Sequence, residues 1–238
     1  MTVSTSQIYD NYSSYRPTAT GGPSQDYFKA NLGPMIDSLN LKPNARILEI
    51  GPGRGELQER LRKTGFIHLE SFEICDEYRQ SLRERGFKVY DGQNLRDLVG
   101  QLPDNYFDVM LAMDVFEHIP LEELTAFLLV FKKKLKKGGS IIGQVPNSSG
   151  LFGQNTFLAD ITHITEFNEA RLDSVLAGSG YENIFISETK LPSSPANLIR
   201  SISRFFIFKL AYLMSRIVGA CPNRCMAHLI MFQAKRPD

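Results

Sequence analysis

The sequence has 238 residues, which is enough for one well-buried α/β domain with some residues left for an insertion or a lid. Its formal net charge of +1 gives no global attraction to a polyanion, so we expect no nucleic-acid partner. The 3 cysteines are too few for a disulfide framework, and the polar N-terminus lacks the pattern of a signal peptide. No apolar run is long enough to span a membrane. These features exclude a secreted disulfide scaffold and favour a cytoplasmic protein.

The first residues differ in composition from the rest. Residues 1–23 are rich in Ser, Thr, Gly and Tyr and show no periodic apolar face. Two interpretations stay open for them, a partly ordered leader and a lid that closes over a ligand. Residues 24–40 carry apolar side chains at helical spacing, and Gly33-Pro34 is expected to kink or split that helix. We expect the main domain to span residues 24–238.

The chain is organised around a glycine-rich turn. An apolar, strand-like run ends in Gly51-Pro52-Gly53-Arg54-Gly55, and a helical pattern follows over 55–64. A dinucleotide fingerprint would need glycine at position 56, where Glu56 stands, and a P-loop would need Gly-Lys-Ser or Gly-Lys-Thr. What remains is an acidic residue, Glu49, two positions before Gly-x-Gly-x-Gly.

Strand and helix patterns alternate after this turn. Further strands are expected at 67–74, 87–90, 106–112, 140–145, 182–187 and 228–233. A helix beginning at Leu121 carries five lysines at its end and is expected to be capped by Gly138-Gly139. The alternation predicts a Rossmann-like α/β fold, a doubly wound, mostly parallel seven-stranded sheet with helices on both faces. Ligands bind such sheets at the carboxyl ends of the strands.

The whole array from 45 to 145 resembles class I S-adenosylmethionine (SAM)-dependent methyltransferases. The resemblance rests on the Glu49–Gly55 motif, the Phe-Asp-Val of the fourth strand, the Glu-His-Ile-Pro sequence after it and the Lys-Lys-Gly-Gly turn before the fifth. Pro52 is a common variant of the motif, and Lys137 stands where the family often has proline, which affects only a turn.

This resemblance implies SAM as the cofactor and assigns residues to it. The glycine-loop backbone would face the methionine carboxylate, Glu73 would accept the ribose hydroxyls, and Asp91 with Gly92 would contact adenine. Met113 and Asp114 would line the methionine end. The predicted cofactor-binding set is Glu49, Gly51, Pro52, Gly53, Gly55, Glu73, Ile74, Asp91, Gly92, Met113 and Asp114.

Two histidines lie where a hydroxyl acceptor would need a base. His163 stands in the segment 146–166, which we expect to be a long polar loop facing the substrate. We hypothesise that His163 is the general base, steadied by Asp160 or Glu166. His118 is the second catalytic candidate, although a packing role is favoured for it.

The acceptor is open among several classes. The stretch 160–167 resembles one that recurs in bacterial methyltransferases associated with polysaccharide and lipopolysaccharide gene sets, so we favour O-methylation of a sugar, a glycan or another small molecule. N-methylation of an amino sugar and methylation of a quinone-type phenol are alternatives within the class. A non-catalytic SAM-fold binding module is the alternative outside it, and Glu56 argues against a nicotinamide dehydrogenase.

A helical insertion is expected at 191–227, before the last strand. At 100° per residue its apolar side chains share one stripe, formed by Ile199, Ile202, Phe206, Leu210, Leu213, Met214 and Ile217. Basic residues lie off this stripe. Three interpretations follow, in order of preference: a helix packed on the domain as a substrate cover, a homodimer contact, and an interfacial helix in peripheral contact with a membrane.

One group of potential metal ligands falls near the end of the insertion. Cys221, Cys225 and His228 offer three ligand atoms. Their spacing is unusual for zinc, and His228 is expected to belong to the last strand. We therefore predict no metal at this position.

Overall fold

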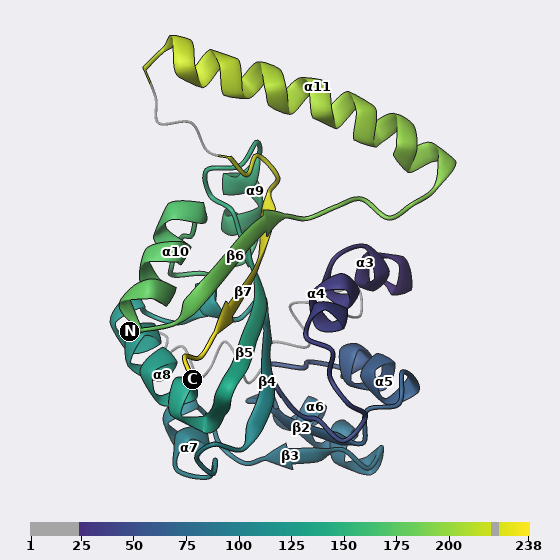
Figure 1. The fold of residues 1–238 in the computed structure, drawn as a ribbon, viewed down its shortest axis with the longest axis vertical. Helices are drawn as coiled ribbons and strands as arrows, with labels where there is room; N and C mark the ends of the chain where they lie inside the picture. The colour runs from purple at the N-terminus through teal and green to yellow at the C-terminus, as the bar shows by residue number, and fades with distance from the viewer. Residues whose placement is uncertain (1–23, 220–223) are drawn as a thin grey trace.

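The computed structural model describes residues 24–219 and 224–238 (Figure 1). The expected lid at 1–23 and Cys221 lie outside these residues. Within them, seven strands form one sheet in the order β3-β2-β1-β4-β5-β7-β6. The strands are β1 Arg46–Ile50, β2 His68–Phe72, β3 Lys88–Tyr90, β4 Phe107–Met113, β5 Leu135–Pro146, β6 Glu182–Glu188 and β7 Leu229–Lys235.

The strand pairing confirms the predicted doubly wound sheet. The pairs among β1 to β5 are parallel, and only β7 runs antiparallel, between β5 and β6. The strand order reverses between β1 and β4, which lie side by side although β2 and β3 separate them in the sequence. In sheets of this kind the ligand crevice lies at such a reversal, beyond the carboxyl ends of the strands.

Helices cover both faces of the sheet, as Figure 1 shows. The helices are α3 Gln25–Ala30, α4 Leu32–Ser38, α5 Glu56–Lys63, α6 Asp76–Glu84, α7 Leu95–Val99, η1 Phe116–His118, α8 Leu121–Lys134, α9 Gly153–Leu158, α10 Glu169–Gly178 and α11 Pro195–Ile217. One core packs α4, α5 and α6 against the face that carries Ile47, and the other packs α7, α8 and α10 against the face that carries Leu48. Adjacent strand residues point to opposite faces, which is why both faces are apolar.

The junction of α8 and β5 differs from the prediction. The helix ends at Lys134 and β5 begins at Leu135, so Gly138-Gly139 lies inside the strand and does not cap the helix. The last helical carbonyls instead accept hydrogen bonds from the chain entering β4, Asn105 N to Lys133 O at 2.9 Å and Tyr106 N to Lys134 O at 2.9 Å. A tertiary contact therefore satisfies the end of this helix.

The first helical region is split as expected, at Asn31, so that Gly33-Pro34 lie in the first turn of α4. The Asn31 side chain at the split makes two hydrogen bonds to the backbone of Lys190. One other segment differs. The predicted polar loop at 146–166 contains the helix α9, which Figure 1 places just beyond the end of β5.

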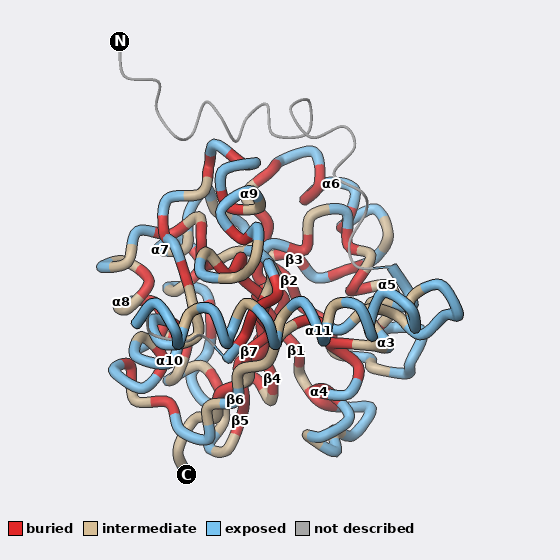
Figure 2. The backbone as a smooth tube through the Cα atoms, turned by 90° about the horizontal axis from the view of Figure 1, so that it is seen from above, coloured by how far each residue is buried: buried red, intermediate tan, exposed pale blue. Residues whose placement is uncertain are grey.

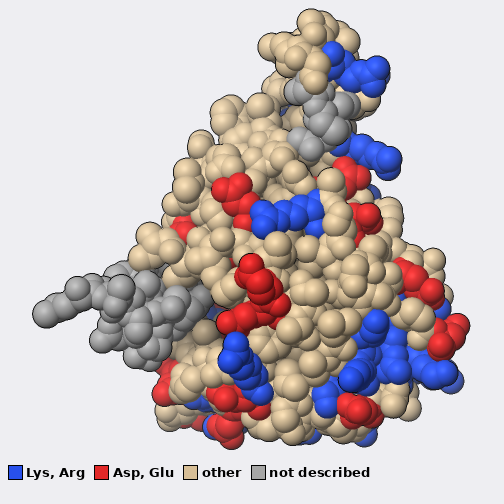
Figure 3. All heavy atoms as spheres, turned by 90° about the vertical axis from the view of Figure 1, so that its left-hand side faces the viewer, with Lys and Arg blue, Asp and Glu red and all other residues tan. Residues whose placement is uncertain are grey.

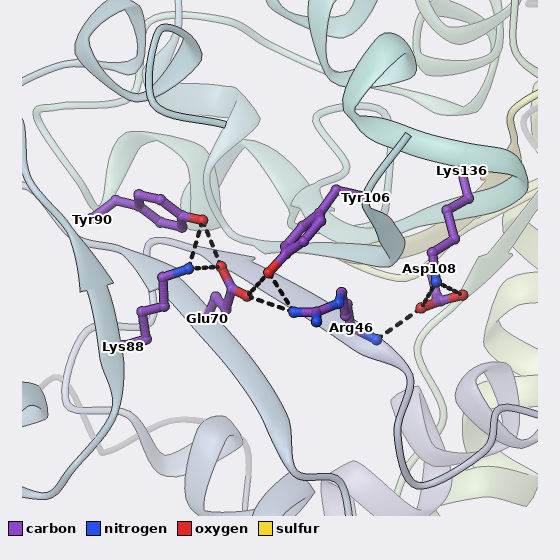
Figure 4. A network of polar contacts seen from close by, with 7 residues as sticks. All are labelled: Arg46, Glu70, Lys88, Tyr90, Tyr106, Asp108 and Lys136. Atoms are coloured by element: carbon purple, nitrogen blue, oxygen red, sulfur yellow. Dashed lines mark hydrogen bonds and ion pairs between the residues drawn. The ribbon is translucent and has the colours of Figure 1, made fainter. Parts of the chain in front are cut away.

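A polar network ties the strands together on the side of the sheet away from the glycine turn (Figure 4). The buried Glu70 carboxylate of β2 accepts hydrogen bonds from Lys88 Nζ at 2.8 Å and Tyr90 Oη at 2.5 Å on β3, and from Tyr106 Oη at 3.2 Å. Nearby, Asp108 pairs with Lys136. Because the charged groups pair with one another, the role of the network is to hold the strands together.

The preferred interpretation of the insertion, a helix packed on the domain, is wrong. Helix α11 lies along the top of the molecule in Figure 1, and none of its residues is buried. Figure 2, a view from above, shows that its surface is exposed along almost its whole length. A search of the described residues finds no helix that is long and apolar enough to cross a membrane.

Candidate active site

The glycine turn joins β1 to α5 in a conformation that requires glycine. Gly51, Gly53 and Gly55 have φ values of 68°, 54° and 78°. A Cβ atom on Gly55 would stand 2.4 Å from Leu82 Cδ2, so α6 packs where a side chain would be. A Cβ on Gly53 would meet nothing within 4 Å, which leaves that side of the turn open to a ligand.

Glu73 is held against this turn. It follows β2, and its carboxylate accepts hydrogen bonds from Gly53 N at 2.9 Å and Cys75 N at 2.8 Å. Burial raises the pKa of Glu73, while the backbone hydrogen bonds oppose the shift. A carboxylate has about four acceptor positions, so two remain for the ribose hydroxyls that the resemblance assigns to it. Ile74 follows it in the chain and packs against the core.

Glu49 lies beneath the turn at the end of β1. It is 3% exposed, and its Oε2 atom has no hydrogen-bond partner among the described residues. Burial raises its pKa to about 8, helped by the charge of Glu73 and opposed by a hydrogen bond from Gln58. An orphaned carboxyl oxygen beside an open glycine turn fits a polar ligand such as the methionine end of SAM.

The structure places Asp91 at the surface. Its side chain is 76% exposed and pairs with Arg83 at 2.7 Å, which lowers the pKa of the carboxyl group. Next to it, the Gly92 carbonyl accepts a hydrogen bond from Arg79 at 2.8 Å, and Arg79 also reaches the Glu73 carbonyl at 2.9 Å. Arg79, which the sequence analysis did not single out, thus joins the ends of β2 and β3.

Asp114 stands just beyond the end of β4, after Met113. It has a positive φ of 54°, and both carboxyl oxygens accept hydrogen bonds from Gln144 Nε2 at 2.9 Å. The Tyr27 hydroxyl in turn donates to Gln144 Oε1. Tyr27 and Gln144 were also missed in the sequence, because the link between α3 and β5 spans more than a hundred residues.

The catalytic candidates line one cavity beyond the ends of β4 and β5. The cavity has a volume of about 650 Å³ and is also walled by α9. Its polar lining includes Asp114, Glu117, His118, Asp160, His163 and His228. The cavity and the cofactor residues share Asp114, so a cofactor at the glycine turn and an acceptor in the cavity would be neighbours.

His163 is oriented by the backbone. Its Nδ1 lies 2.7 Å from the Phe157 carbonyl oxygen, and since a carbonyl can only accept, Nδ1 carries the proton. In the neutral ring Nε2 is then the basic nitrogen. It lies 3.9 Å from both Glu117 Oε1 and Asp160 Oδ2. Glu166 was a predicted partner of His163, but its hydrogen bond is made with Gln154.

His118 belongs to the same group. Its Nδ1 lies 2.9 Å from Thr162 Oγ1, which donates its own proton to Asp160 Oδ1 at 2.6 Å, so His118 is the donor to Thr162. The rings of His118 and His163 meet edge to face, with centroids 4.7 Å apart. Asp160 therefore connects the two histidines that the sequence analysis named.

Glu117 completes this group and was missed. It is fully buried, and neither carboxyl oxygen has a hydrogen-bond partner among the described residues. Burial raises its pKa well above the ordinary value, and the charges of Asp114 and Asp160 add to the shift. Its backbone carbonyl accepts hydrogen bonds from Ile164 and Thr165, which brings the histidine segment to this place. The Glu-His pair at the end of β4 was the available signal.

Two kinds of chemistry suit this group. A buried carboxyl pair beside an imidazole supports proton transfer. The ligand atoms of Glu117, His118 and His163 also lie within 4.8 Å of one another, so a divalent cation could bind among them. His228 was expected in the last strand, but β7 begins at Leu229, so His228 precedes it. Cys225 is buried.

Comparisons with known proteins identify the family and the fold. The model of the methyltransferase domain family matches residues 27–185. A ubiquinone biosynthesis O-methyltransferase of Paramagnetospirillum magneticum is 28% identical over 138 residues, which are 51% of this chain and 48% of that protein. A ribosomal RNA small subunit methyltransferase A of Synechococcus is 33% identical over 91 residues, 36% of this chain and 31% of that protein. The chain thus spans half or less of these relatives.

Solved structures show the same fold. A SAM-dependent methyltransferase from Archaeoglobus fulgidus has a TM-score of 0.64 at 24% identity, covering 89% of this chain and 94% of that one. The phosphoethanolamine N-methyltransferase 2 of Haemonchus contortus, solved with SAM, has a TM-score of 0.65 at 14% identity, covering 100% of this chain and 61% of that one.

The chain belongs to the methyltransferase domain family. The class predicted from residues 45–145, a class I SAM-dependent methyltransferase enzyme with SAM as its cofactor, is confirmed. The roles of the individual cofactor and catalytic residues remain predictions.

Proposed function

We propose that this methyltransferase transfers the methyl group to a hydroxyl group of a sugar, a glycan or another small molecule held in the 650 Å³ cavity. The observation that carries this proposal is the basic nitrogen of His163, which lines the cavity and lies 3.9 Å from two carboxyl groups. A hydroxyl is a poor nucleophile at neutral pH and gains most from such a base.

The residues that would hold the cofactor are those of the glycine turn, Glu49, Glu73 and Asp114. SAM supplies an electrophilic methyl group when bound. The turn offers backbone N–H groups at the start of α5, and the Glu73 carboxylate is fixed by two hydrogen bonds before any ligand arrives. Such preorganisation reduces the entropy lost when the reactants are aligned.

The proton is managed by His163 and its neighbours. As the acceptor oxygen forms its bond to the methyl carbon and the carbon–sulfur bond of the methyl donor breaks, Nε2 of His163 would take the hydroxyl proton. The Nδ1–H group keeps its hydrogen bond to the Phe157 carbonyl oxygen, so the imidazole ring can become a cation without rotating. Asp160 lies at 3.9 Å from Nε2 and offsets this positive charge. His118 positions Asp160 through Thr162.

Other acceptors within the class differ in how far they would need this base. A neutral amine attacks without first losing a proton, so an amino sugar has less need of this base. A phenolic hydroxyl does use one, and the similarity to a ubiquinone biosynthesis O-methyltransferase supports that acceptor. The sugar and phenol alternatives are distinguished by a screen of nucleotide sugars, glycans and phenols with methyl-labelled SAM, which reads where the label is transferred.

The first prediction tests the base. His163→Gln should lower kcat about 10²- to 10⁴-fold, the usual contribution of a general base, while SAM affinity measured by calorimetry stays unchanged. His228→Gln is the matched control, because His228 lines the same cavity but is not in the hydrogen-bonded group, and it should keep turnover within a few-fold.

Three results would contradict the proposal. Near-full turnover of His163→Gln would show that His163 is not the general base. Loss of wild-type activity on chelation, with recovery on adding Mg²⁺ or Mn²⁺, would make Glu117, His118 and His163 a cation site instead. Absence of SAM binding would favour the non-catalytic module.

A further inference from the structure

The side of helix α11 that faces the domain is mostly small and polar, whereas a packed helix turns its apolar side inward. The residues that are partly covered by the rest of the chain are Asn197, Arg204, Phe208, Ala211 and Ser215. At 100° per residue they share one side of the helix, and four of the five are small or polar. Arg204 donates to the Thr189 carbonyl at 2.6 Å and pairs with Glu188, which anchors this side.

The opposite side of α11 is apolar and exposed. The outward stripe, defined as Ile199, Ile202, Phe206, Leu210, Leu213 and Ile217, has side chains between 52% and 75% exposed. A surface helix normally buries its apolar stripe against the core and exposes its polar side. Here the arrangement is reversed, so the stripe is available to something outside the described part of the chain.

The charges on α11 all have one sign. Arg200, Arg204, Lys209 and Arg216 are its charged residues, and the helix has no acidic residue. On the helical projection Lys209 and Arg216 border the outward stripe on one side, while Arg200 lies on the other side of the helix, closer to the domain-facing residues. Figure 3 shows Lys and Arg side chains at the top of the molecule. Basic side chains bordering an apolar stripe match the headgroup region of an anionic bilayer.

A second exposed apolar group lies on the same side of the molecule. Phe152, Leu158, Ile161 and Ile164, in and around α9, are between 52% and 78% exposed. Figures 1 and 2 place α9 and α11 at the same end of the molecule. Phe152 also lines the cavity, so this second apolar group borders the proposed acceptor site.

We propose that α11 and the α9 region form a docking surface for an anionic phospholipid bilayer. The helix would lie in the plane of the headgroups, with the stripe toward the acyl chains over its length of about 35 Å. The finding that no described helix can span a membrane agrees with contact at the surface. A second copy of the chain fits less well, because a symmetric contact through the stripe would bring Lys209 and Arg216 close to basic residues with no acid on α11 to pair with them.

The experiment exploits the absence of tryptophan from the sequence. Phe206→Trp places one reporter in the outward stripe, and Ile67→Trp, at a site 68% exposed in the loop before β2, is the matched control. Vesicles of phosphatidylcholine with phosphatidylglycerol should shift the tryptophan emission of the Phe206→Trp variant to shorter wavelength and leave that of the Ile67→Trp variant unchanged. Pure phosphatidylcholine should give a much smaller shift, and added salt should weaken the response.

A second set of variants tests the contacts by co-sedimentation with the same vesicles. Leu213→Glu and the combination of Arg200→Glu with Lys209→Glu should each lower binding at least tenfold, whereas Ile67→Glu should not. The proposal is overturned if wild-type protein ignores anionic vesicles at low salt, or if the emission shift of Phe206→Trp follows protein concentration without vesicles. The latter result would assign the stripe to a second copy. Neither readout requires turnover, so both are independent of the proposed reaction.

Discussion

Three buried carboxyl groups near the carboxyl ends of the strands differ in how they are satisfied. Glu73 accepts two backbone hydrogen bonds, Glu49 keeps one oxygen without a partner, and both oxygens of Glu117 are without one among the described residues. Burial raises the pKa of all three. Charged forms of these groups cost stability, and such costs are common where a site must meet a polar ligand.

Glu49 makes stability depend on pH. Its pKa is raised from 4.5 to about 8, so between these values the unfolded chain loses a proton that the folded chain keeps. The free energy of unfolding should therefore fall by at most about 1.4 kcal/mol per pH unit across this range because of this group. The Glu49→Gln variant lacks this titration, so the difference between its free energy of unfolding and that of the wild type should grow in its favour from about pH 5 to about pH 7.5. Urea denaturation followed by circular dichroism measures both free energies. The same difference at both pH values would refute the prediction.

Glu73 and Asp91 should differ in their effect on SAM affinity. Glu73→Gln loses a fixed, charged acceptor and should weaken binding about 10- to 100-fold, the equivalent of about 1.5–3 kcal/mol for a charged hydrogen bond. Asp91→Asn should have a smaller effect, because this carboxylate is exposed and already paired with Arg83. Titration calorimetry of both variants compares them, and a larger loss in Asp91→Asn would reverse the assignment.

Strand β5 shows how tightly one element is fitted into the sheet. Its Gly143 is buried between β4 and β7, and a Cβ there would stand 2.4 Å from both Ala112 O and Phe232 Cζ. A side chain at this position would push two neighbouring strands apart. The central strand that delivers Gln144 to Asp114 therefore depends on a residue without a side chain.

Two glycine substitutions should have opposite effects on stability. Gly143→Ala should destabilise the protein by about 1–3 kcal/mol through overpacking. Gly178→Ala, the same change at the end of α10 with nothing within 4 Å of the new Cβ, should stabilise it by about 0.5–1 kcal/mol. Denaturant unfolding of both variants provides the measurement. An unchanged stability of Gly143→Ala would contradict the close approach of Ala112 in β4 and Phe232 in β7 to Gly143.

The whole molecule consists of a two-faced sheet domain and a helix that lies outside it. The two apolar cores include residues from the central strands and from the helices on either face, but none from α11. The stability of the domain should therefore be independent of the outward stripe.

A pair of Leu→Ala changes tests this separation. Leu213→Ala, at a site 55% exposed, should change the free energy of unfolding by no more than about 0.5 kcal/mol, as surface substitutions do. Leu172→Ala, fully buried in α10, should cost about 2–5 kcal/mol. Both are measured by urea denaturation without lipid. A large loss in Leu213→Ala would restore the interpretation of α11 as a packed cover.

Much of the fold was predictable from the sequence, and candidate cofactor residues could be named from it. The alternation of strands and helices, the glycine turn and the acids at the strand ends are local patterns, since side-chain periodicity and turn chemistry act over a few residues. For the same reason His163, Asp160 and His118 were identified as candidates, but their joint geometry was not.

Only the tertiary structure decided the rest, because it depends on contacts between segments far apart in the chain. Backbone hydrogen bonds to Glu117 bring the segment 160–165 beside the end of β4, and burial there leaves the Glu117 carboxyl group without a partner among the described residues. The end of α8 is satisfied by residues entering β4. The glycine turn, taken together with Glu73, Asp91 and the other motifs of residues 45–145, indicated from the sequence alone a protein that binds a methyl donor. The cavity beyond the strand ends and the outward orientation of the apolar stripe of α11 were decided by packing, which no local pattern encodes.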